Sequence, residues 1–88
     1  MHENKTPVTL ADTAKLMESD DYKDRFVAEY RQLEIRERKL QEMLGKWDRG
    51  EINFKPSCPR SIYDLQLKSM SEYRAVLEAR AAIEGVEI

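Results

Sequence analysis

The side chains best suited to binding chemistry in this chain are a basic cluster and a set of tyrosines. Arg36, Arg38 and Lys39 lie close together in the sequence, and such cations bind phosphate through charge-assisted hydrogen bonds. Most basic clusters on helices are only solvated, but two copies brought together by a dimer axis would form a compact anion site. The tyrosines, whose rings can stack on nucleobases, are Tyr22, Tyr30, Tyr63 and Tyr73.

The tyrosines differ in how available they are to a ligand. Tyr30 and Tyr73 recur with apolar residues at helical spacing, so we expect them in the core or in an interface. Tyr22 lies at the start of a predicted helix and has the most freedom to contact a ligand.

The residues needed for catalysis or for metal binding are scarce. The single histidine, His2, lies in a predicted tail, and the single cysteine is Cys58. These two residues form neither a Ser/His/acid set nor a zinc ligand pattern, and the chain has no phosphate-binding glycine loop. We therefore expect a non-enzymatic protein without a cofactor or a metal.

The charge pattern bears on the class of partner. Charged residues make up 36% of the 88 residues, yet the formal net charge is only -2. This balance argues against a DNA-coating protein, which needs a net basic surface. No apolar run is long enough to span a bilayer and no apolar signal core is present. We expect a cytoplasmic protein that binds neither DNA nor membranes.

Helix start and stop signals divide the chain into a flexible tail at 1–8 and a single helical domain at 9–88. Thr9 with Asp12 predicts a capping box, and Ser19 followed by two aspartates predicts a second helix start. Pro59 suits the first turn of a third helix, which Gly85 ends. The predicted helices span about 9–18, 20–48 and 59–84, and Ile52 and Phe54 are expected to pin the connector as an ordered loop.

The predicted long helix at 20–48 has one apolar stripe with a charge inside it. Glu37 interrupts the stripe, and we expect it to be partly exposed and paired with a basic residue of a neighbouring chain. Leu40 is expected to lie in the hairpin core together with Leu77. The stripe consists of Phe26, Tyr30, Leu33, Leu40, Leu44 and Trp47.

The predicted last helix has an apolar face too wide for one partner helix. Its main stripe is Tyr63, Leu67, Met70, Tyr73, Leu77 and Ala81. A flank of Ile62, Leu65, Val76 and Ile83 widens it. The width implies a second packing surface, and a chain this small often gains stability from partner chains. The sequence therefore predicts an all-α protein, a short helix followed by two long antiparallel helices, that forms a homo-oligomer.

Two stretches resemble a family of small helical phage proteins. Residues 22–40 share an aromatic at the helix start, a Glu-x-x-x-Leu pattern and basic residues ahead of Leu40. Residues 65–80 read Leu-x-Leu-x-x-Met-x-x-Tyr-x-x-Val-Leu-x-x-Arg, which resembles the family's second long helix. The family is similar to the phage anti-CBASS sponge proteins, which sequester cyclic oligonucleotide signals of a bacterial defence system.

The resemblance implies both an assembly and a site. It implies a dimer-based homo-oligomer, in the form of a hexamer, acting in the cytoplasm of the infected bacterial host. Cyclic dinucleotides would lie between protomers, held by an aromatic, here Tyr22, and by a basic residue further along the helix, here Arg36 or Lys39. For a second site that takes cyclic trinucleotides, the nearest candidate is Lys68.

An alternative function needs no nucleotide. The apolar flank of the last helix would dock on a host or phage protein, so the chain would act as a protein-interaction module, either an inhibitor or a regulator. Binding of cyclic nucleotides separates the two hypotheses.

Overall fold

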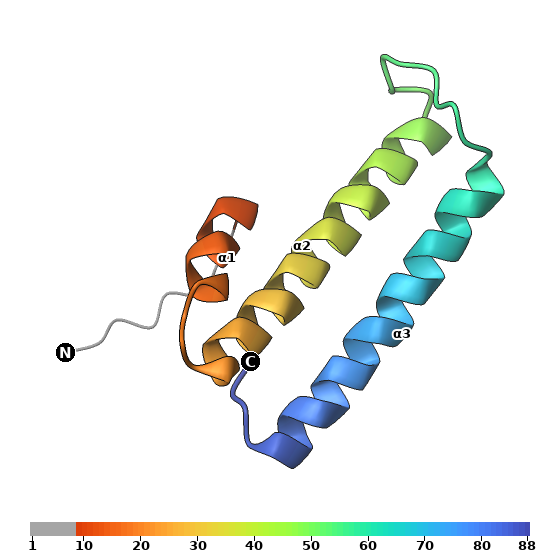
Figure 1. Cartoon of the computed structure of the whole chain (residues 1–88). Helices are drawn as coiled ribbons and strands as arrows, with labels where there is room; N and C mark the ends of the chain where they lie inside the picture. Colours follow the sequence, from red (N-terminus) through yellow and green to blue (C-terminus); the bar gives the residue numbers. More distant parts are fainter. Residues whose placement is uncertain (1–8) are drawn as a thin grey trace.

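The computed structural model describes residues 9–88, which form a helical hairpin with a short helix packed beside it (Figure 1). The helices are α1 (Leu10–Met17), α2 (Tyr22–Asp48) and α3 (Arg60–Glu84). The described part of the chain contains no strand. A short helix followed by two longer ones is the order that the sequence predicts. The tail predicted at 1–8 lies outside the described residues.

Side-chain caps fix where the first two helices begin. The Thr9 hydroxyl accepts a hydrogen bond from the backbone N–H of Asp12 at 3.1 Å, and the Asp12 carboxylate accepts one from the Thr9 N–H at 3.2 Å. This is the predicted capping box. For α2, however, the cap is Asp21, which accepts from the Lys23 N–H at 2.9 Å. Ser19, the expected cap, instead donates to Asp24 at 2.7 Å and braces the first turn.

The third helix begins and ends where its sequence signals place it. Pro59 precedes the first residue of α3 without a side-chain cap. Gly85 adopts a left-handed conformation with φ 72°, and this lets the next N–H, that of Val86, bond back to the Ala81 carbonyl at 2.9 Å. In the connector, Ile52 is half-buried but Phe54 is 51% exposed, so the expected pinning by both side chains is wrong for Phe54.

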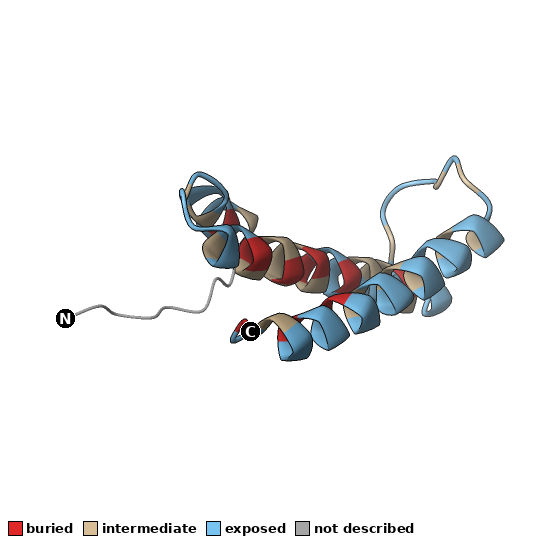
Figure 2. Cartoon of the chain, turned by 60° about the horizontal axis from the view of Figure 1, so that its bottom comes forward, coloured by how far each residue is buried: buried red, intermediate tan, exposed pale blue. Residues whose placement is uncertain are grey.

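The hydrophobic core lies between α2 and α3, toward the N-terminal half of α2 (Figure 2). Its buried members are Phe26, Tyr30, Leu33, Leu77, Ala81 and Val86. Leu77 is 1% exposed, as predicted for a core residue. Leu40 is only half-buried, because at its level an open hollow takes the place of a packed core.

The α2 helix is buried on a second face that the sequence analysis missed. Ala28 and Ile35 are almost fully buried, yet each lies two residues beyond a core residue and therefore roughly on the opposite side of the helix. The α1 helix packs beside this part of α2 and contributes the fully buried Thr13 (Figure 1). A central helix covered on both sides explains why α2 carries most of the buried residues.

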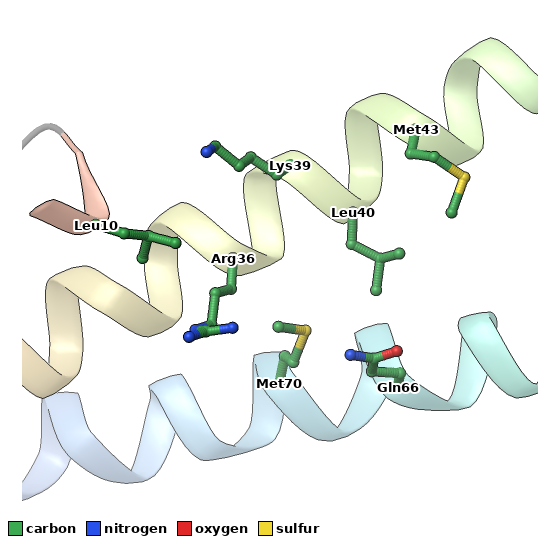
Figure 3. A pocket seen from close by; sticks show the side chains of 7 residues that line it. All are labelled: Leu10, Arg36, Lys39, Leu40, Met43, Gln66 and Met70. Carbon is green, nitrogen blue, oxygen red and sulfur yellow. The ribbon is translucent and has the colours of Figure 1, made fainter. Parts of the chain in front are cut away.

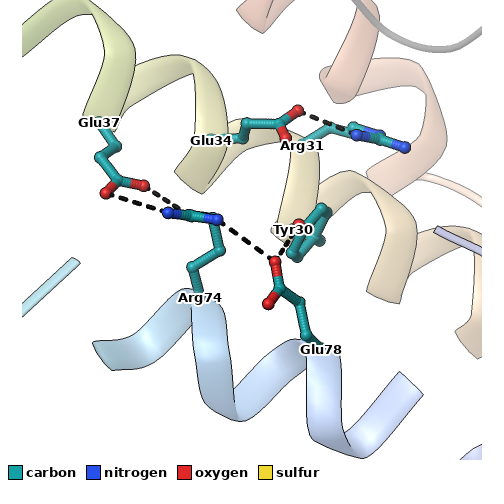
Figure 4. A network of polar contacts seen from close by, with 6 residues as sticks. All are labelled: Tyr30, Arg31, Glu34, Glu37, Arg74 and Glu78. Carbon is teal, nitrogen blue, oxygen red and sulfur yellow. Dashed lines mark hydrogen bonds and ion pairs between the residues drawn. The ribbon is translucent and has the colours of Figure 1, made fainter. Parts of the chain in front are cut away.

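An ion pair occupies the seam between the long helices (Figure 4). Glu37 is 5% exposed and accepts hydrogen bonds from the Arg74 guanidinium at 2.7 and 3.5 Å. The expectation of a partly exposed Glu37 paired with another chain is therefore wrong, because the partner is on α3 of the same chain. Tyr73, expected on the stripe, is exposed because Arg74 takes its place facing α2.

The pair belongs to a larger polar network across the hairpin. Arg74 also bonds to Glu78 at 3.3 Å, and the Tyr30 hydroxyl donates to Glu78 at 2.6 Å. The Glu37 carboxylate raises the pKa of Arg74 above its usual range, so the cation stays charged. Burial, together with the Glu78 carboxylate, raises the pKa of Tyr30. The network ties the two long helices in one register.

At the connector end of the hairpin, aromatic and charged side chains hold α2 to α3. The Trp47 and Tyr63 rings meet edge to face at 5.9 Å. Arg60 forms an ion pair with Asp48, and its guanidinium lies over the Trp47 ring. Because Arg60 donates hydrogen bonds to it, the pKa of Asp48 lies below its usual value. These contacts position the connector at the tip of the hairpin.

Candidate functional site

Two of the predicted site residues line one hollow between the three helices. Arg36 and Lys39 of α2 lie on its rim, and Figure 3 shows Arg36 extending toward α3 and Lys39 on the side of α1. The hollow has a volume of about 350 Å³. The side chains that complete it are Leu10, Leu40, Met43, Gln66 and Met70.

The two cations of this hollow are available to an anion. Neither the Arg36 side chain nor the Lys39 side chain forms a hydrogen bond or an ion pair within residues 9–88. Their neighbour Arg38, by contrast, lies 3.8 Å from the Glu42 carboxylate. A cation with no protein partner can donate all its hydrogen bonds to a phosphate. The basic cluster is thus divided into two unpaired cations and one paired cation.

The floor of the hollow is apolar, so it complements the flat part of a ligand. Leu40 and Met43 of α2, Met70 of α3 and Leu10 of α1 supply its apolar lining. Methionine side chains adapt their shape to what they contact. Leu10 and Gln66 drew no attention in the sequence as site residues. For Leu10, the sequence offers one signal, its place on the apolar face of a short helix. For Gln66, the sequence offers no signal of a role in a site.

Tyr22 lies far from these cations within one chain. It is the first residue of α2 and is 46% exposed, and Arg36 follows it by fourteen residues, which is about 21 Å along a helix. Its neighbours are instead at the end of α3. The Arg80 guanidinium, with a smaller contribution from the Tyr22 hydroxyl, lowers the pKa of Glu84. One protomer therefore does not bring the aromatic and the basic residues of the predicted site together.

Lys68 is separate from the hollow. Its side chain is 74% exposed on α3 and lies 3.8 Å from the Glu72 carboxylate one turn later. It does not line the hollow that contains Arg36 and Lys39. Any ligand at Lys68 would therefore occupy a different surface from a ligand at the basic rim.

Other site chemistries find little support in the described part of the chain. Residues 9–88 contain no group of acidic, histidine or cysteine side chains that could hold a metal ion. Cys58 is half-buried and forms no disulfide. None of the described helices is long and apolar enough to cross a membrane.

The described chain is a small three-helix protein with unpaired cations and apolar side chains around one hollow. The sequence model of the Sequestin family matches residues 20–83, which span α2, the connector and nearly all of α3. The chain belongs to the Sequestin family. This match confirms the resemblance to a family of sequestering phage proteins, and the family name points to a binding role rather than a catalytic one. No curated protein and no solved structure matches the chain significantly.

Proposed function

We propose that this protein is a phage-encoded, non-enzymatic immune antagonist that sequesters cyclic oligonucleotide second messengers between protomers of a homo-oligomer. The observation that carries the proposal is the pair of unpartnered cations, Arg36 and Lys39, over an apolar hollow. A protein of this kind acts by stoichiometry and affinity, in the cytoplasm of the infected host.

The chemistry of the ligand suits the hollow. A cyclic dinucleotide carries two phosphates and two flat bases, which need cations and apolar or aromatic surfaces. Arginine binds phosphate through paired hydrogen bonds, and Lys39 adds a second positive charge on the same rim. A two-fold interface would double both features, so its symmetry would match that of the ligand.

A second protomer is needed to bring Tyr22 to the ligand. On its own helix it lies about 21 Å from Arg36, so a ring that stacks on a base beside Arg36 must come from another copy. The α3 helix offers an interface for that copy. Its exposed apolar side chains fall along one side of the helix, and they are Ile62, Leu65, Tyr73, Val76 and Ile83.

The shape of the chain also favours association. The radius of gyration is 15.5 Å, whereas a compact chain of this length has a value of about 12 Å. An elongated hairpin leaves much of α3 uncovered (Figure 2). Lys68, on another face of α3, is the candidate for a separate site that takes cyclic trinucleotides.

The exposed stripe of α3 supports a second candidate function. In this alternative the stripe docks on a host or phage protein, and the chain works as a protein-interaction module. Apolar patches of this kind are typical of protein–protein contacts. The alternative requires no cyclic nucleotide, and substitutions such as Ile62→Glu or Val76→Glu would then abolish the effect on the partner.

A thermal-shift panel with cyclic di- and trinucleotides tests the leading proposal. A ligand that binds only the folded protein must raise the melting temperature. Arg36→Ala and Lys39→Ala should each reduce this shift. The shift of the wild type should also become smaller as the salt concentration rises, because salt screens phosphate contacts. Arg38→Ala is the matched control, since Arg38 is paired with Glu42 and does not line the hollow. No shift with any cyclic nucleotide well above micromolar concentration would overturn the proposal.

A further inference from the structure

A second hollow lies beside the first, at the connector end of the hairpin. It has a volume of about 430 Å³ and lies between the C-terminal half of α2 and the connector. Lys46 of α2 and Phe54 of the connector both line it. Lys39 and Met43 line both hollows, so the two hollows are neighbours along α2, and together they are called the groove.

The cations of this groove form a row. Arg36, Lys39 and Lys46 lie on one side of α2, and the ten-residue step from Arg36 to Lys46 covers about 15 Å. Like the other two, the Lys46 side chain has no hydrogen bond or ion pair in the described part of the chain. The two carboxylates in the second hollow are already engaged elsewhere. Glu42 lies 3.8 Å from Arg38, and Glu51 lies 2.9 Å from Arg49.

Phe54 places an aromatic ring at the end of this row. It is 51% exposed and belongs to no core cluster, although exposure of an apolar ring of this size to water is unfavourable. Asn53 beside it adds an amide that can bond to a base edge. An aromatic ring next to unpaired cations is the combination by which proteins bind single-stranded nucleic acids without sequence preference.

We propose that the connector supplies an aromatic surface of the ligand site, so that a base of a cyclic oligonucleotide stacks on Phe54 while Lys39 and Lys46 bind its phosphates. This inference rests on the proposed function and adds residues to the same site. It also gives each protomer an aromatic ring within reach of its own cations, which Tyr22 is not. The ligand class is a nucleotide with a base and more than one phosphate.

The test is isothermal titration of the full chain with cyclic di-adenylate and cyclic tri-adenylate. Phe54→Leu keeps apolar bulk but removes the flat ring, and it should weaken binding by about five- to a hundredfold. Phe54→Tyr keeps the ring and should bind like the wild type. Lys46→Ala should weaken binding and reduce the slope of log K against log salt by about 0.7, the value for one lost phosphate contact.

Lys55→Ala is the matched control for charge. Lys55 is exposed on the same connector but lines neither hollow, so its removal should leave affinity and salt slope unchanged. If the wild type binds and Phe54→Leu and Lys46→Ala bind equally well, the role of the connector is overturned while the proposed function stands. If the wild type binds neither probe, both fall together.

Discussion

Glu37 and Arg74 place opposite charges at facing positions of the two long helices. Along the seam, the positions one turn before and one turn after each of these two residues are apolar. An ion pair at such a place contributes little net stability, because both groups lose water. Its value lies in register, since a slip by one turn would leave the Glu37 carboxylate buried without a partner.

Removing one partner of this pair should therefore cost much more than replacing both. Arg74→Leu alone should lower the free energy of unfolding by about 3 kcal/mol, because the carboxylate of Glu37 remains buried and unpaired. The double variant Glu37→Leu with Arg74→Leu should come within about 1 kcal/mol of the wild type or exceed it. Urea denaturation of the three proteins measures this coupling. Additive effects of the two single changes would contradict it.

Two leucines of the sequence-predicted seam should now behave differently. Leu77 is almost fully buried in the core cluster, so Leu77→Ala should cost about 2–5 kcal/mol. Leu40 lines the hollow and is half-buried, so Leu40→Ala should cost less than half as much. Chemical denaturation of both variants in parallel compares them. Equal losses would mean that the hollow is closed in solution.

For single residues, the sequence predicts which side chains share a helix face, but it does not predict where the buried stripe changes from one spacing to another. From Met70, a step of three reaches Tyr73 and a step of four reaches Arg74, and both steps fit a helix. Hydrophobicity favours Tyr73, whereas the fold selects Arg74 because Glu37 faces it across the seam. Pairing between distant charges is not visible in the periodicity of one helix.

Among the helices, the boundaries were more predictable than the packing. Caps, prolines and glycines are local signals, so the observed helices begin and end within about two residues of the predicted ones. Burial of the second face of α2 was not predictable in the same way. Ala28 and Ile35 lie two turns apart on one face, but the residues between them on that face are Arg31 and Gln32, which interrupt an apolar stripe. The short α1 that covers them gives a weak pattern of its own.

Ion pairs at the ends of the helices should make the hairpin sensitive to acid. The pKa of Asp48 is lowered by Arg60, and that of Glu84 is lowered by Arg80. On acidification the unfolded chain therefore takes up protons before the folded one does. The stabilisation is fully present above the ordinary carboxylate pKa of about 4. It is lost as the pH falls through the lower folded values.

Thermal melts from neutral to acid pH measure this loss. The melting temperature should hold down to about pH 5 and then decline below about pH 4. Asp48→Asn should lower the melting temperature only slightly at neutral pH, since the pair is exposed. The same variant should lose less melting temperature than the wild type between neutral and acid pH. Glu87→Gln removes a carboxylate without an ion pair among the described residues and serves as the control. A decline identical in Asp48→Asn and wild type would refute the role of Asp48.

At the scale of the whole molecule, an elongated hairpin exposes the side chains that a partner would cover. The apolar residues of α3 that face away from α2 lie about a third of a turn from the seam, too far round for α2 or α1 to reach them. The same geometry leaves Tyr22 distant from Arg36 in each chain. Association through α3 would cover the stripe, and in the proposed function it would bring Tyr22 of a second copy to Arg36.

We expect oligomerisation and ligand binding to be lost together when a charge is placed on the stripe. Val76→Glu would bury an unpaired carboxylate in the proposed interface, which is energetically costly. Light scattering at micromolar concentration should give at least twice the monomer mass for the wild type and the mass of one chain for Val76→Glu. Cyclic nucleotide binding should weaken in the same variant. Ala75→Glu adds the same charge one residue away, on an exposed side of α3 outside the stripe, and should change neither mass nor binding. A wild-type protein that is monomeric, with a cooperative melt, would refute the assembly. A monomeric Val76→Glu that binds as tightly as the wild type would instead place the whole site within one chain.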